Sequence, residues 1–196
     1  DDAISDEQLD PTVITGQTAE ATIATDDLIL LSDTSASGAL RKMTRANFVS
    51  GVGGTNTPAF LAYKTSNQSI SNTSSTKVTF EAEQLDSGSV YNTSNSRFTP
   101  GVVGYYMIGA KWRYDTGTDA DAIQWRLFKN GSIISKVTIP NNDSTGMAYN
   151  QLIYSDADDY FEMYAYQNSG GSVNINGDST YPEQDQAQFY AFKIIQ

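Results

Sequence analysis

The fold is decided by residues 98–114, which read FTPGVVGYYMIGAKWRY. From residue 105 the stretch alternates, as expected for a β-strand whose side chains point in turn to opposite faces of a sheet. Tyr105 and Met107 belong to the set that faces away from the core. The other set is predicted to face the core and consists of Tyr106, Ile108, Ala110, Trp112 and Tyr114. The stretch is therefore predicted to be a long strand at the centre of the fold.

Further strands are predicted downstream of this one. Residues 122–129 and 132–139 are predicted as two strands joined by Asn130-Gly131, a strong signal for a β-hairpin. Three more strands are expected at residues 151–154, 160–167 and 188–195. Several short strands separated by turn residues are typical of a sandwich or barrel. We therefore expect an all-β domain.

Six spaced residues connect the central strand with a known family. They are Phe80, Asp86, Tyr91, Phe98, Gly104 and Tyr106. Their spacing, F-x5-D-x4-Y-x6-F-x5-G-x-Y, resembles the signature of the complement component 1q globular head and the tumour-necrosis-factor-like jelly rolls. The resemblance covers residues 58–196 and implies a jelly roll of two antiparallel sheets. It also implies a homotrimer with the central and C-terminal strands along its axis, which would place Tyr105 and Met107 in the subunit interface.

The first 54 residues differ in composition from the rest of the chain. They hold only one of the 22 aromatic residues, Phe48, and nine acids against three bases. We expect an acidic extended arm over residues 1–25, a hairpin-helix module over residues 26–54 and a linker over residues 55–57. Thr44 is expected to cap the helix. A hairpin with two helical turns cannot bury a core of its own, so the module needs a partner.

The module itself also resembles a known segment. Residues 26–52 read DDLILLSDTSASGALRKMTRANFVSGV, similar to a short module near the N-termini of many bacteriophage fibre and adhesin proteins. The alternative is an arbitrary hairpin-helix linker. The resemblance implies that residues 1–54 attach the chain to other virion proteins.

Composition excludes several classes of function. The net charge of −11 argues against nucleic acid and against anionic membrane surfaces as partners, and no apolar run is long enough for membrane insertion. The chain lacks Cys and His, which removes thiol chemistry, Ser-His-Asp hydrolysis and nearly every zinc or haem site. Glu81, Glu83 and Glu162 are interpreted as acids on solvated sheet faces rather than a glycosidase pair. We therefore expect no enzymatic activity and no cofactor.

One loop could hold a metal ion. Asp115, Asp119 and Asp121 place three carboxylates within seven residues, and carboxylate oxygens suit calcium. The loop lacks the register of an EF-hand, so a solvated acidic turn is the alternative.

Two tyrosines are candidates for ligand binding. In residues 160–167, Phe161, Met163 and Ala165 occupy core positions, which leaves Tyr164 and Tyr166 pointing outward. Exposed aromatic residues at this density mark an interface or a ligand platform. A surface glycan or protein of a host is therefore a possible ligand, and an ordinary surface or interface role for both tyrosines stays open.

These observations predict a non-enzymatic bacteriophage virion structural protein at the particle surface: a fibre, a spike or a capsid-decorating head fibre. Its trimeric jelly-roll head would contact the host surface. Two alternatives remain: a secreted recognition protein of the complement type, and a purely stabilising capsid decoration.

Overall fold

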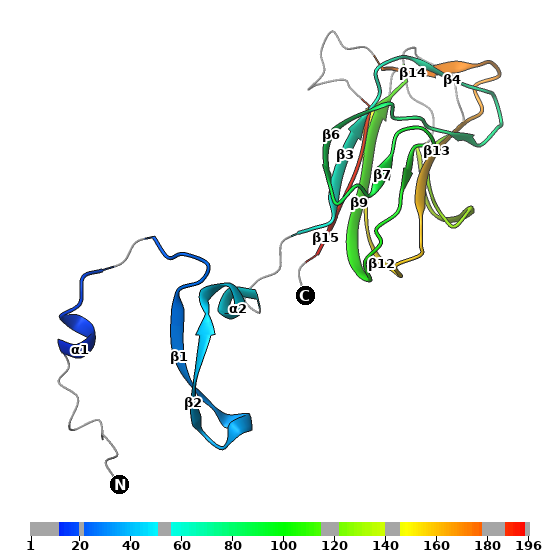
Figure 1. The fold of residues 1–196 in the computed structure, drawn as a ribbon. Coiled ribbons are helices and arrows are strands. Elements are labelled where there is room, and N and C mark those ends of the chain that lie inside the picture. Colours follow the sequence, from blue (N-terminus) through cyan, green and yellow to red (C-terminus); the bar gives the residue numbers. More distant parts are fainter. Residues whose placement is uncertain are drawn as a thin grey trace. The chain divides into compact units, whose positions relative to one another are not determined.

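The protein is described by a computed structural model (Figure 1). It describes residues 12–19, 22–50, 56–114, 122–139, 146–177 and 187–194. The chain divides into two compact units, Asp1–Gly54 and Thr55–Gln196.

The N-terminal unit is built around a hairpin and a short helix. Strand β1 (Leu28–Asp33) pairs antiparallel with β2 (Ala39–Thr44), and the 3₁₀ helix η2 (Thr34–Ala36) lies between them. Helix α2 (Arg45–Ser50) follows, and the Thr44 hydroxyl accepts a hydrogen bond from the Asn47 N–H, as expected for a cap. Between residues 22 and 50 no residue is buried. The unit therefore has no core in its described part.

A single helical turn, α1 (Thr12–Thr15), lies within the segment expected to be an extended arm. The Gly16 N–H closes this turn by donating to the Thr12 carbonyl.

The second unit is an antiparallel β domain. Its first strands are β3 (Ala59–Tyr63), β4 (Gln68–Ile70), β5 (Thr76–Lys77), β6 (Ala82–Ser87), β7 (Tyr91–Asn92), β8 (Arg97–Phe98) and β9 (Gly104–Arg113). They are followed by β10 (Ile123–Lys129), β11 (Ser132–Ile139), β12 (Gly146–Ser155), β13 (Phe161–Gln167), β14 (Val173–Ile175) and β15 (Gln188–Lys193). Strand β12 begins five residues before the predicted strand at residues 151–154, because it pairs with β9 along the full length of that strand.

Two sheets enclose the core of this domain (Figure 1). One has the strand order β12-β9-β15-β3-β6, and the other has the order β11-β10-β13-β8-β7 with β5 also paired to β13. A small sheet of β14 and β4 adds to one end. This is the expected fold, an all-β antiparallel jelly roll.

The six spaced residues of the sequence signature have separate structural roles. Phe80, Phe98 and Tyr106 are fully buried, and the Tyr91 ring stacks on Phe60 at 4.7 Å between centroids. The Asp86 carboxylate accepts hydrogen bonds from the backbone N–H groups of residues 90 and 91, which holds the turn between β6 and β7. The signature thus marks the residues that join the two sheets.

The remaining signature residue is Gly104, which has φ of 154° at the start of β9. A Cβ there would come within 2.6 Å of the Lys193 side chain. The five inward positions predicted from alternation, four in β9 and Tyr114 directly after it, are all buried, and Trp112 stacks on Trp125 of the opposite sheet at 5.3 Å.

The Asn130-Gly131 hairpin is also confirmed. Both residues have positive φ, 52° and 78°, the conformation that a two-residue type I′ turn requires. The Asn130 side chain donates to the Asp159 carboxylate and accepts from the Tyr160 N–H, so the turn is fixed to the loop before β13.

Candidate functional site

The outward side of the β12-β9-β15-β3-β6 sheet carries an unusually apolar surface. Tyr105 and Met107 point outward from β9 as predicted, and Tyr105 is 41% exposed. In register, Tyr105 lies opposite Tyr154 of β12, and their rings meet edge to face at 5.3 Å. Met107 lies between Leu152 of β12 and Phe192 of β15. These residues form an apolar strip across three adjacent strands.

The strip continues onto β3 and β6. Tyr190 of β15 lies opposite Leu61 of β3, which in turn lies opposite Leu85 of β6. Leu152 and Leu85 are each more than half exposed. We call this surface the apolar face, defined by Leu61, Leu85, Tyr105, Met107, Leu152, Tyr154, Tyr190 and Phe192. Sequence reasoning found only Tyr105 and Met107, although the same alternation in the other strands could have identified the rest.

Gly109 shapes the middle of the apolar face. Its position in β9 lies between Asn150 of β12 and Tyr190 of β15. The Tyr190 hydroxyl donates to the Asn150 amide oxygen across it. A Cβ at residue 109 would overlap both of these side chains. Glycine therefore allows the Tyr190 ring to lie across β9.

The opposite sheet presents a different surface. Tyr164 and Tyr166 point outward from β13 as predicted, and both are half-buried. The Tyr164 ring stacks on Phe128 of β10 at 4.0 Å between centroids. The Tyr166 ring is covered by the Arg126 guanidinium, 4.2 Å from the ring centroid. Part of each ring is thus already in contact within the chain.

Glu162 corrects one sequence prediction. It was expected on a solvated face, but its side chain is only 4% exposed. Its Oε1 atom accepts from Lys77 at 2.8 Å and from Arg97 at 2.9 Å, and Arg97 also lies over the Tyr160 ring at 3.7 Å. Burial opposes ionisation, but the hydrogen bonds from Lys77 and Arg97 outweigh it and hold the pKa of Glu162 below its ordinary value. The two cations therefore cover the carboxylate on the outer side of the sheet.

Glu81 is likewise more than a solvated acid. It binds Lys64, whose side chain is fully buried, at 2.9 Å between Nζ and Oε1. Lys64 also donates to Gln68 and Thr79, and burial lowers its pKa. By contrast, Glu83 is exposed. The Lys64–Glu81 pair is a structural ion pair, because its charges bind each other and polar groups of the chain.

The calcium prediction at Asp115, Asp119 and Asp121 falls on residues outside the described ranges. Elsewhere in the described chain no three acids are grouped as metal ligands. Asp159 is buried and accepts hydrogen bonds from the Asp156 N–H and the Asn130 amide, so its role is to fix a turn.

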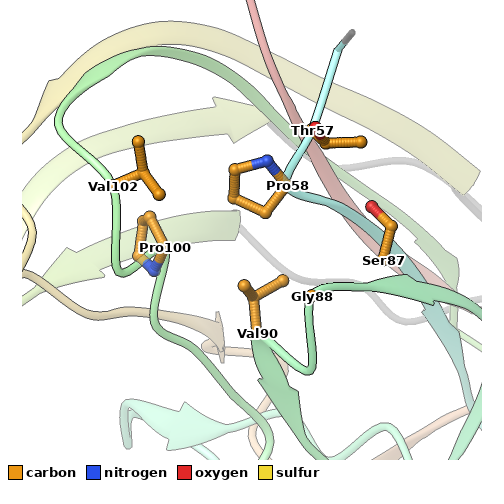
Figure 2. Close-up of a pocket in the computed structure, with 7 residues that line it drawn as sticks. All are labelled: Thr57, Pro58, Ser87, Gly88, Val90, Pro100 and Val102. Atoms are coloured by element: carbon orange, nitrogen blue, oxygen red, sulfur yellow. The ribbon is translucent and has the colours of Figure 1, made fainter. Parts of the chain in front are cut away.

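A pocket of about 420 Å³ lies at the end of the jelly roll where β3 begins (Figure 2). Pro58, Val90, Pro100 and Val102 form its apolar wall, and Thr57 and Ser87 add two hydroxyls (Figure 2). The lining contains no titratable side chain. The pocket thus lacks the acid and base groups that hydrolysis of a glycan requires.

The comparisons with known proteins agree with this architecture. The chain matches no model of a known protein family. A search of curated proteins finds no relative either. Among solved structures, it is similar to Eiger TNF from S. frugiperda, with 10% identity, a TM-score of 0.51, and coverage of 69% of this chain and 91% of that chain. The fold is that of the tumour-necrosis-factor-like jelly rolls.

A second similar structure is the globular domain of zebrafish complement 1qA protein. It is 16% identical with a TM-score of 0.47, and the match covers 70% of this chain and 97% of that chain. Separately, no helix in the described part of the chain is long and apolar enough to cross a membrane.

Proposed function

We propose that this chain is a non-enzymatic recognition protein whose jelly-roll head forms a homotrimer through the apolar face. The observation that carries the proposal is the continuity of that face across five paired strands. Exposed apolar surfaces of this extent mark protein interfaces. Obligate interfaces are apolar and bury on the order of 2,000 Å² or more in total.

The trimer rather than another assembly is supported by the fold and by the sequence signature. The six spaced residues resemble a family whose members trimerise along the central and C-terminal strands. Those strands correspond here to β9 and β15, which carry Tyr105, Met107, Tyr190 and Phe192 of the apolar face.

The test is Met107→Lys in the full chain. The substitution would bury three unpaired charges in a trimer, each costing several kcal/mol. We expect wild-type protein to have a trimeric mass by light scattering and the variant to have a monomeric mass with an unchanged circular dichroism spectrum. Ile134→Lys adds the same charge to an exposed apolar position of the other sheet and serves as the control. A monomeric mass for wild-type protein would overturn the proposal.

We further propose that residues 1–54 attach the head to a larger assembly. The support is the lack of buried residues in the described part of the hairpin-helix module, up to residue 50, together with the exposure of its leucines. Leu28, Leu30 and Leu40 share one side of the hairpin by register, and Leu30 and Leu40 are about 70% exposed (71% and 69%). Such a side needs a partner to be buried.

The assembly that we favour is a bacteriophage particle, with the head at its surface for host contact. The support is the resemblance of residues 26–52 to the N-terminal modules of phage fibre proteins. A binding measurement on host cells distinguishes host contact from a purely stabilising decoration, because a decorating head would bind no host surface.

A further inference from the structure

The cations of the head are concentrated on one surface. Residues 58–196 carry nine Lys and Arg residues against fourteen Asp and Glu residues. Four of the nine cations lie on the outward side of the β11-β10-β13 sheet and its neighbours β5 and β8: Lys77, Arg97, Arg126 and Lys136. The acid that this surface carries in the described chain is Glu162. We call this surface the cationic face; its charge of 4 − 1 = +3 contrasts with the acidic head.

Two of these cations lie directly opposite each other. Arg126 of β10 and Lys136 of β11 are partners in the strand register. Like charges at such positions destabilise a sheet. Glu162 does not compensate them, because it binds Lys77 and Arg97 and lies in register with Phe128 rather than with Arg126. Lysine protects an edge strand such as β11 against aggregation, but this does not explain an arginine on the inner strand β10.

The Arg126 side chain is held in place before any ligand binds. Its Nε donates to the Gln124 amide oxygen at 2.8 Å, and Gln124 is buried. Its guanidinium lies on the Tyr166 ring. The terminal N–H groups of Arg126 have no hydrogen-bond partner within the described chain. A guanidinium fixed in this way presents a planar fork to a carboxylate, sulfate or phosphate group.

Aromatic rings lie beside this fork. Tyr164 is the register partner of Arg126 on the β13 side, and its ring stacks on Phe128. Tyrosine combines an apolar ring face with a polar hydroxyl. A sugar ring has the same combination of an apolar face and polar edges. Anion-binding groups and ring-binding groups thus lie next to each other on the cationic face.

We propose that the cationic face binds an anionic saccharide, with the acidic group on Arg126 and Lys136 and the sugar ring against the parts of Tyr164 and Tyr166 that Phe128 and Arg126 leave exposed. This inference deepens the proposed function and rests on it only for the expectation that the head binds a ligand. The protein's own net charge of −11 disfavours a long nucleic acid, whose backbone the rest of the surface would repel.

The test is calorimetric titration of the full chain at low ionic strength with oligogalacturonate, with its methyl ester and with a heparin oligosaccharide. We expect binding of at least one of the two acidic saccharides, weakened by added salt. The neutral methyl ester should bind about tenfold more weakly than the free acid where the free acid binds.

Variants locate the site. Arg126→Gln should weaken binding of the acidic saccharide about tenfold or more, because it removes charge-assisted hydrogen bonds. Lys136→Gln should weaken it less, and it serves as the second variant if Arg126→Gln lowers the thermal midpoint. Lys42→Gln removes the same charge from the N-terminal module and should leave the affinity unchanged.

Three results would overturn the inference: no binding of either acidic saccharide, equal binding after the substitutions at 126 and 136, or equally tight binding of a single-stranded DNA oligonucleotide. Light scattering on the same samples separates this inference from the proposed function. A trimer that binds no saccharide contradicts only the inference, whereas a monomer that binds one contradicts the trimer.

Discussion

At the residue scale, the head contains two groups of paired charges, and each group has one member that is buried. Lys64 is fully buried and has Glu81 as its counter-charge. Glu162 is almost fully buried and binds Lys77 and Arg97. An ion pair of this kind adds little stability when intact, but the loss of one partner leaves an uncompensated charge. The five side chains are thus sensitive to substitution even though none belongs to the apolar face.

The first prediction concerns Glu81→Gln. The substitution keeps the Lys64 hydrogen bonds to Gln68 and Thr79 but removes the Glu81 carboxylate from the buried ammonium. We expect the free energy of unfolding in urea to fall by about 3 kcal/mol. Glu83→Gln, two residues away and exposed, is the matched control and should change it by less than about 0.5 kcal/mol. Equal effects of the two substitutions would contradict the role of the pair.

The second prediction concerns pH. The pKa of Glu162 is lower in the folded protein than in the unfolded chain, where it is about 4.3. The stability from its ionisation is therefore fully present above that value and is lost as the pH falls through the lower folded pKa. Glu81 and Asp159 act in the same direction.

We therefore expect the free energy of unfolding to decline on acidification below about pH 5. Glu162→Gln should be less stable than wild-type protein at pH 7, because Lys77 and Arg97 lose their partner, and should decline less steeply in acid. Urea unfolding from pH 3 to pH 7 measures both. A variant with the wild-type slope would show that Glu162 does not contribute to the acid sensitivity.

At the scale of the element, sequence alternation predicted the strands whose two faces differ most. β9 and β13 alternate between buried and outward residues, and their inward sets were assigned correctly. Alternation could not predict β4, β5 and β14, which are two or three residues long and depend on pairing with distant segments. Nor could it predict that Glu162 is buried, because the covering cations come from β5 and β8, 85 and 65 residues away in the chain, respectively.

The third prediction concerns the contact between β9 and β15. Gly109→Ala would displace the Tyr190 ring, which lies across residue 109. The displaced atoms are at the end of a side chain on the apolar face, so the fold should persist while the shape of the face changes. We expect a circular dichroism spectrum like that of wild-type protein and a light-scattering mass that falls toward the monomer on dilution.

The Gly170→Ala control adds the same methyl group at a position with open space around it, although its positive φ makes alanine strained there. It should cost some stability but leave the trimer intact. A Gly109→Ala variant that stays trimeric on dilution would show that Tyr190 does not need its observed position for assembly.

At the scale of the whole molecule, the two units differ in how they gain stability. Every buried apolar residue of the described chain lies between residues 58 and 191, whereas the hairpin-helix module buries none in its described part. Hydrophobic burial is the dominant favourable contribution to folding. The jelly roll therefore has the means to fold by itself, whereas the described part of the module lacks this contribution.

The last prediction follows from this difference and concerns deletion of residues 1–54. The remaining chain should stay folded and assemble with the same number of subunits as full-length protein, because the core and the apolar face are both retained. It should no longer be incorporated into phage particles, because the exposed side of the hairpin is gone.

Full-length protein with Leu30→Lys and Leu40→Lys tests the same point without shortening the chain, since it places two charges on that side. Incorporation of the truncated head, measured by imaging and protein content of purified particles, would contradict attachment through residues 1–54. A truncated head that becomes monomeric would instead assign part of the trimer contact to the module.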